Sequence, residues 1–117
     1  MSLLLRGGMV ADGETREVFE ADVLVADGVI EAVGKGLAAD GAEVIDCTGL
    51  IIAAGFADAH VHIESSMVLP EAFGEAILPF GTTVIIADPH EVVNVAGAAG
   101  LRLFMRECAK SPADVFV

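Results

Sequence analysis

Asp58-Ala-His60-Val-His62-Ile-Glu64 places four side chains of the metal-ligand type at every second residue. Side chains alternate between the two faces of an extended strand, so on a strand all four would project to the same side. Two imidazoles at i and i+2 can then bind one divalent cation, with carboxylates beside them to balance its charge and orient the rings. The spacing therefore indicates a metal site. The opposing interpretation is a half-buried strand with one solvated face.

The residues just before this segment weigh against the solvated-face interpretation. The run Leu50-Ile-Ile-Ala-Ala-Gly55-Phe56-Ala57 is apolar throughout, unlike an amphipathic edge strand. Polar side chains enter only as the segment ends, which is where functional groups of a buried strand are expected.

Composition excludes several classes of function. Eighteen acidic and six basic residues give a net charge of -12, which repels nucleic acid phosphates and anionic lipids, so we expect neither nucleic acid nor membrane partners. Hydrophobic residues make up 55% of the chain, which favours a globular protein. Asp58 and Arg102 interrupt the longest apolar runs, which stay below the roughly 18 residues that a membrane span needs. We expect a cytoplasmic location, with Cys47 and Cys108 as buried free thiols.

The first half of the chain has the pattern of a β-rich domain. Short strand-like segments alternate with glycine-containing turns, and Asp27-Gly28 is typical of a type I′ hairpin turn between strands 21–26 and 29–33. Further strands are expected at 3–5, 43–46 and 50–52, with Gly7-Gly8 as a break. We predict that residues 1–54 are part of a composite β-sandwich domain.

The second half, residues 55–117, predicts an α/β fold with a β-α-β-α-β order. The first strand ends with His60, His62 and Glu64, and a helix starts at Pro70 and ends near Leu78. Thr82–Ala87 is apolar enough to be buried on both faces of a parallel sheet. A second helix, with Asn94 as its N-cap, is expected before Ser111-Pro112, and a third strand after it.

A second group of polar residues, Asp88-Pro-His90-Glu91, follows the second of these strands. Consecutive parallel strands joined by right-handed crossovers end at one common edge, so this group and the histidine pair should lie together. Active sites of such folds are found at that edge. Two independent polar segments converging there favour a metal site over a solvated strand face.

The supporting residues have competing interpretations. Asp58 could hold an imidazole by its free N–H or be purely structural. Glu64 could orient substrate or support the metal site, or it could cap a helix or order the loop with Ser65 and Ser66. We assign supporting or substrate-contacting roles to four residues, of which the last three could also bind an auxiliary metal: Glu64, Asp88, His90 and Glu91. For His90, a hydrogen bond that organises the loop is the alternative.

Gly55-Phe-Ala-Asp58-Ala-His60-Val-His62 resembles the first barrel strand of the amidohydrolase superfamily. The segments HVHIESSM (60–67) and ADPHE (87–91) together resemble the adenine deaminase family within it. The resemblance implies a composite β-sandwich followed by a metal-dependent (β/α)8 barrel, of which residues 55–117 would be the first strands and helices. It implies hydrolysis of adenine to hypoxanthine and ammonia in purine salvage.

The same resemblance implies that His60 and His62 are metal ligands of a dinuclear site that holds divalent manganese, iron or zinc. The remaining ligands and the catalytic acid would come from later strands, so we expect the 117 residues to be an inactive N-terminal portion of a protein that is a homo-oligomer at full length. Two alternatives remain open. One is another amidohydrolase acting on a cyclic amide or aminated heterocycle, and the other is a non-catalytic metal-binding or interaction module.

Overall fold

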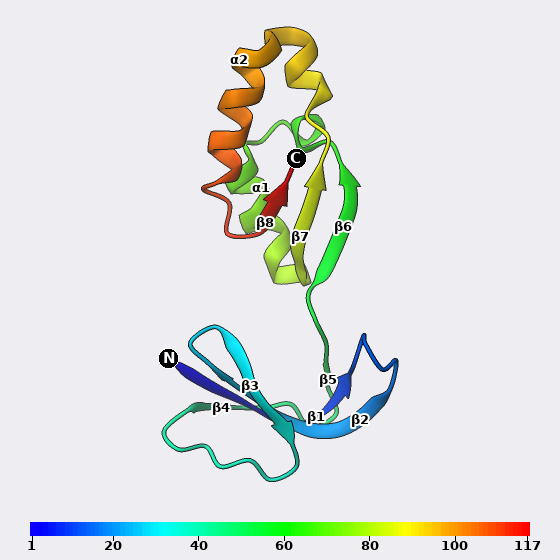
Figure 1. Cartoon of the computed structure of the whole chain (residues 1–117), viewed down its shortest axis with the longest axis vertical. Coiled ribbons are helices and arrows are strands. Elements are labelled where there is room, and N and C mark those ends of the chain that lie inside the picture. Colours follow the sequence, from blue (N-terminus) through cyan, green and yellow to red (C-terminus); the bar gives the residue numbers. More distant parts are fainter. The chain divides into compact units, whose positions relative to one another are not determined.

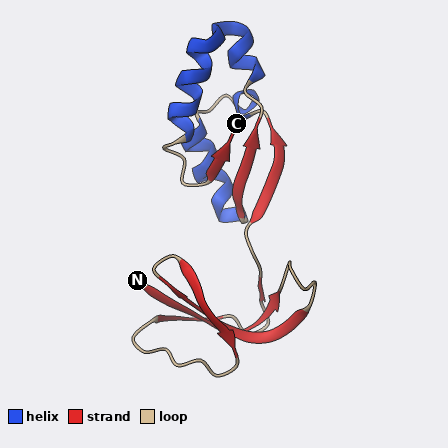
Figure 2. Cartoon of the chain, in the orientation of Figure 1, coloured by secondary structure: helices blue, strands red, loops and turns tan.

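The computed structural model describes all 117 residues as two compact units, Met1–Ala54 and Gly55–Val117 (Figure 1). Strands alone make up the regular structure of the first unit, whereas both helices belong to the second (Figure 2). Each unit has its own sheet, and the units are described separately below.

The first unit is built around one five-stranded sheet. Its strands are β1 (Ser2–Ala11), β2 (Val18–Ala26), β3 (Val29–Gly34), β4 (Glu43–Asp46) and β5 (Ile51–Ile52). The order is β3-β2-β1-β4, with β5 also paired to β1. Pairing is antiparallel between β1 and β2 and between β2 and β3, whereas β4 and β5 run parallel to β1. The composite sandwich itself stays a prediction.

Two turns of this sheet show why the sequence folds as it does. Asp27 and Gly28 have φ angles of 50° and 81°, the two positive values that a type I′ hairpin turn requires. Gly7 was expected to end the first strand, but β1 continues through it by a bulge, with Gly7 at a φ of 70°. The carboxylate of Asp22 accepts the backbone N–H of Gly7 at 2.8 Å and that of Leu37 at 3.0 Å. One buried aspartate thus stabilises both the bulge and a loop.

The second unit has the predicted β-α-β-α-β order. Its elements are β6 (Phe56–Val61), η1 (Ile63–Ser66), α1 (Pro70–Ile77), η2 (Leu78–Phe80), β7 (Thr82–Ala87), α2 (His90–Cys108) and β8 (Asp114–Phe116), where η denotes a 3₁₀ turn. The three strands are parallel in the order β6-β7-β8. Pro70 is the first residue of α1, where its missing N–H leaves no hydrogen bond unmade.

The core of this unit lies on one face of its sheet. Ile85 of β7 and Ile63 of η1 are fully buried, and Phe104 of α2 is buried in the same cluster. Both helices contribute side chains to this cluster. The expectation that β7 is buried on both faces is wrong, because Ile86 is 48% exposed on the other face. Truncation of a fully buried side chain such as Ile85 to alanine should cost about 2–5 kcal/mol.

Helix α2 differs from its predicted form. It begins at His90 rather than after Asn94, and it is interrupted at Gly97, whose φ of 57° and ψ of -148° are not helical. A Cβ on Gly100 would lie 2.8 Å from the Cβ of Ala96 and 2.9 Å from the carbonyl oxygen of Val92, so the glycine allows a close approach there. Because of the interruption at Gly97, the helix consists of two segments joined by that glycine.

Both cysteines are buried and neither forms a disulfide, as predicted for Cys47 and Cys108. Neither helix combines the length and the apolar character that crossing a bilayer requires.

Candidate metal centre

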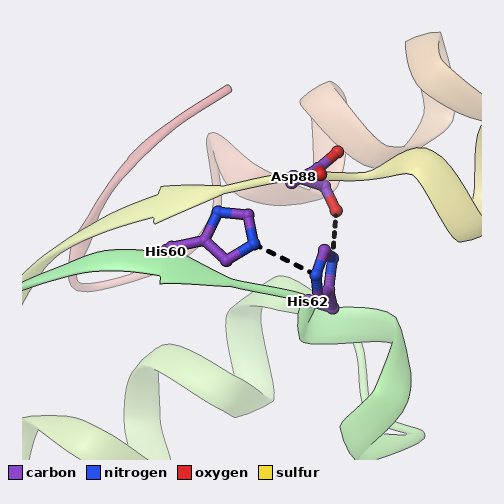
Figure 3. A group of neighbouring side chains, drawn as sticks. All are labelled: His60, His62 and Asp88. Atoms are coloured by element: carbon purple, nitrogen blue, oxygen red, sulfur yellow. Dashed lines mark hydrogen bonds between the residues drawn. The ribbon is translucent and has the colours of Figure 1, made fainter.

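Two neighbouring strand ends supply the candidate site. His60 is in β6, His62 is the first residue after it, and Asp88 follows β7. The backbone N–H of Asp88 donates to the carbonyl oxygen of Val61 at 3.0 Å, which ties the two strand ends together. One potential ligand atom from each of His60, His62 and Asp88 lies within 4.8 Å of the others (Figure 3).

The two imidazoles, which lie two residues apart in the sequence, point toward one another (Figure 3). Nε2 of His60 lies 3.2 Å from Nε2 of His62. Two nitrogens that bind one tetrahedral cation at about 2.0–2.1 Å would lie about 3.3 Å apart. The observed separation therefore fits a shared cation, which would lie between two nitrogens that otherwise have only each other as partners.

The tautomer of the neutral His62 ring follows from its second nitrogen. Nδ1 of His62 lies 2.9 Å from the backbone carbonyl oxygen of Asp88. A carbonyl oxygen only accepts hydrogen bonds, so Nδ1 carries the proton and donates it. In the neutral ring the lone pair is then on Nε2, the nitrogen that faces His60. This is the arrangement by which proteins orient metal-binding histidines.

Asp88 therefore has two functions at the strand end. Its carbonyl oxygen orients His62, and its carboxylate completes the donor group. Two imidazole nitrogens and a carboxylate oxygen are a donor set that suits Zn²⁺, Mn²⁺ or Fe²⁺. The residues present thus fit a divalent cation, and the carboxylate would balance part of its charge.

His90 lies beside this group. Its Nδ1 is 3.3 Å from Oδ2 of Asp88, and its ring contacts the ring of His62 edge-on, with centroids 4.6 Å apart. The His90 side chain is about half exposed. His90 therefore packs against His62 and Asp88. These contacts agree with both interpretations of His90, as a residue that organises the loop and as one that supports the site.

The structure separates the other candidates from the donor group. The expectation that Asp58, His60, His62 and Glu64 project to one side is wrong, because β6 ends at Val61 and Glu64 lies within η1. The carboxylate of Asp58 accepts the backbone N–H of His60 at 3.1 Å rather than a ring N–H.

Glu64 and Glu91 instead connect η1 to the start of α2. Oε1 of Glu64 accepts the backbone N–H of Val92 at 3.3 Å, and the hydroxyl of Ser65 donates to Oε1 of Glu91 at 2.6 Å. Pro89, the N-cap of α2, makes no side-chain cap hydrogen bond, so Glu64 supplies an acceptor for that helix end from outside. These contacts are the ones expected from the alternative interpretation of Glu64, in which it caps a helix or orders the loop.

Taken together, the parallel sheet and the histidine pair at its strand ends define an α/β protein with a candidate divalent-metal site at the carboxyl edge of the sheet. Residues 51–117 match the sequence model of the Amidohydrolase family. The chain belongs to this family, whose members use divalent metals.

Individual relatives agree with the family assignment. The chain is 52% identical over 99 residues to an adenine deaminase of Deinococcus radiodurans, a match that covers 85% of the chain and 18% of that protein. It is 41% identical over 115 residues to an adenine deaminase of Geobacillus kaustophilus, covering 98% of the chain and 19% of that protein. The chain thus spans about a fifth of the length of these curated relatives.

Among solved structures, a D-hydantoinase superposes on 98% of the chain with a TM-score of 0.75 and 25% sequence identity. The chain corresponds to 26% of that protein. The fold is therefore that of one part of a larger amidohydrolase.

Proposed function

We propose that the chain forms part of an adenine deaminase, in which adenine and water give hypoxanthine and ammonia. The observation that carries the proposal is the convergence of His60, His62 and Asp88 within a chain that is 52% and 41% identical to two adenine deaminases. The similarity to adenine deaminases supports a small-molecule substrate, and the net charge of -12 weighs against nucleic acid and anionic lipid partners. A cytoplasmic location and a homo-oligomeric full-length protein stay predictions.

The chemistry of this reaction explains what the donor group is for. Deamination replaces the amino group on C6 of adenine by oxygen, and neutral water is too weak a nucleophile for that carbon. A divalent cation supplies Lewis-acid activation of water near neutral pH. His60 and His62 would hold the cation, with Asp88 beside them, and the carbonyl oxygen of Asp88 keeps the proton of His62 on Nδ1.

The proposal includes the larger architecture and the limits of this chain. Residues 1–54 would contribute to a composite β-sandwich and residues 55–117 would be the first units of a (β/α)8 barrel. The exposed face of β7, marked by Ile86, would then be covered by the rest of the barrel. Protonation of the departing amine needs an acid. The remaining metal ligands and this acid would come from later strands of the barrel, so we expect the chain alone to be inactive.

The alternative substrate class, a cyclic amide, is favoured by one observation, the superposition on a D-hydantoinase. One experiment separates the two. The complete reading frame that encodes this chain is expressed and loaded with Mn²⁺, Fe²⁺ or Zn²⁺ in parallel, and ammonia release from adenine is measured beside ring opening of hydantoin. Ammonia from adenine that is lost in His60→Ala supports the proposal. Ring opening of hydantoin without deamination would replace it by the alternative.

A further inference from the structure

Three hydrogen bonds join the segment of His62 and η1 to the segment of Asp88 and the first turn of α2. Nδ1 of His62 donates to the carbonyl oxygen of Asp88, the hydroxyl of Ser65 donates to Glu91, and the N–H of Val92 donates to Glu64. The first contact lies within the candidate metal centre. The other two lie just after it on both chain segments, because His62 directly precedes η1 and only Pro89 separates Asp88 from α2.

We infer that Ser65 and Glu91, with Glu64, act as positioning residues that hold the donor atoms of His62 and Asp88 at metal-binding distance. This inference rests on the proposed metal site and adds to it residues that have no place in the donor group. The side chains themselves do not reach the cation; they fix the two segments that carry its ligands.

The strength and direction of the contacts support this role. The Ser65–Glu91 distance of 2.6 Å is that of a hydrogen bond to a charged acceptor, the stronger kind. The only other side-chain hydrogen bond between η1 and α2 is that of Glu64, which accepts at 3.3 Å. Without these two hydrogen bonds, the separation of His62 from Asp88 would depend on the single hydrogen bond between them, on strand pairing and on the apolar packing of Ile63 in the core.

One carboxylate oxygen of Glu64 lacks a hydrogen-bond partner, and a positioning role explains why this loss of free energy is tolerated. Its Oε2 is buried and has no hydrogen-bond partner. Leaving a buried polar atom unpaired costs free energy, and in native proteins such atoms call for an explanation. The other oxygen of this carboxylate meets the N-terminal end of α2, where a negative charge is favourable. The chain thus tolerates an unpaired oxygen at the point where η1 must be fixed to α2.

The neighbouring serine offers a matched control. The hydroxyl of Ser66 donates to the carbonyl oxygen of Ile63 within η1 itself, at 2.5 Å, rather than to α2. Ser65→Ala and Ser66→Ala therefore remove the same atom from adjacent residues. Only the first breaks a contact between the two ligand-bearing segments, and neither changes the charge near the site.

The test is calorimetric titration with Zn²⁺ of the metal-free protein from the complete reading frame, repeated with Co²⁺ while the visible absorption bands are recorded. Loss of a group that supports metal ligands typically lowers affinity by about 10–100-fold. We expect Ser65→Ala to weaken Zn²⁺ binding by about tenfold, at the lower end of this range, and to alter the Co²⁺ spectrum. Ser65→Thr, which keeps the hydroxyl, should restore both, and Ser66→Ala should match the unmodified chain.

Further variants keep the test decisive. Glu91→Ala should weaken binding, and adding Ser65→Ala to it should change nothing more, because the contact is already lost. Thermal unfolding identifies variants that do not fold. If Glu91→Ala is one of them, Glu91→Gln, which keeps an acceptor oxygen, is used in its place. Equal affinity of Ser65→Ala and the unmodified chain, or equal losses in both serine variants, would overturn the inference. If the unmodified chain binds neither metal, the metal site itself fails and the inference with it.

Discussion

The carbonyl oxygen of Asp88 lies 2.9 Å from Nδ1 of His62, so a backbone atom from one strand end sets the orientation of a side chain from the next. The contact depends on parallel pairing of β6 with β7, which brings Asp88 beside Val61. A side-chain substitution at Asp88 would keep this hydrogen bond while removing the carboxylate. The two contributions of one residue can therefore be tested separately.

Substitution of the imidazoles should distinguish direct ligands from neighbours. His62→Ala removes a nitrogen that faces the candidate cation position, so Zn²⁺ affinity of the chain should fall by more than the roughly 10–100-fold that supporting groups are worth. His90→Ala removes only the contacts with Asp88 and the ring of His62, and should cost less. Calorimetric titration of both variants checks the order. A larger loss in His90→Ala than in His62→Ala would assign the ligand role to His90.

Substitution of Asp88 by asparagine tests the carboxylate alone. The backbone carbonyl oxygen remains, so His62 should keep its orientation, but one charged donor of the three-residue group is lost. We expect Zn²⁺ affinity to fall by at least about tenfold with no change in the thermal unfolding of the chain. Unchanged affinity would leave His60 and His62 as the only ligands that this chain supplies.

The meeting of the two polar segments could be predicted from sequence, because parallel strands end at a common edge whatever their side chains are. The role of Glu64 could not be settled in the same way. The chain leaves extended geometry after Val61 and enters a 3₁₀ turn, and the alternation that would place Glu64 beside His62 stops there. Nothing in the spacing of residues 58–64 marks that point.

The start of α2 and its interruption could not be predicted from the sequence for a related reason. Asn94 has the chemistry of an N-cap, yet the helix begins at His90, where an acceptor from another element, Glu64, serves the helix end. A contact between segments that lie far apart in sequence leaves no local pattern. The interruption at Gly97 is likewise a matter of backbone geometry, for which a single glycine in the sequence is an ambiguous sign.

Gly97 should be sensitive to any side chain. Its φ of 57° and ψ of -148° lie in a region that L residues rarely adopt, although a Cβ there would meet no atom within 4 Å. Gly97→Ala should therefore destabilise the chain by about 1–3 kcal/mol through backbone strain alone. Gly13→Ala is the control, because Gly13 also has open space but no positive φ. Denaturant unfolding of both variants measures the difference, and equal stabilities would contradict the explanation.

Cys108 should resist alkylation in the folded chain. Burial raises the pKa of its thiol to about 11, and the negative charges of Glu64 and Glu107 act in the same direction. At pH 8 only about one thiol in a thousand would then be the reactive thiolate. In a Cys47→Ala chain, iodoacetamide should modify Cys108 slowly until denaturant is added, as followed by mass spectrometry. Rapid modification of the folded chain would show that the thiol is accessible.

Asp22 should make the stability of the first unit dependent on pH in the acid range. Hydrogen bonds from the backbone N–H groups of Gly7 and Leu37 hold the pKa of its carboxyl below the model-compound value of 3.8. The unfolded chain therefore binds more protons than the folded chain between these two pKa values. Stability from this group is fully present above pH 3.8 and is lost as the pH falls through the lower, folded-state pKa.

Asp22→Asn tests this sign directly, because the amide keeps the shape but must turn its NH₂ group toward one of the two N–H donors. The variant should unfold at a lower temperature than the unmodified chain at neutral pH, and the gap should narrow as the solution is acidified below pH 3.8. Asp12 and Asp46, whose pKa values are also lowered, remain in both proteins and cancel in the comparison. Asp40 is an exposed loop residue, so Asp40→Asn should show no such gap. A gap that stays constant from neutral to acid pH would mean that Asp22 stabilises the sheet by its shape and not by its charge.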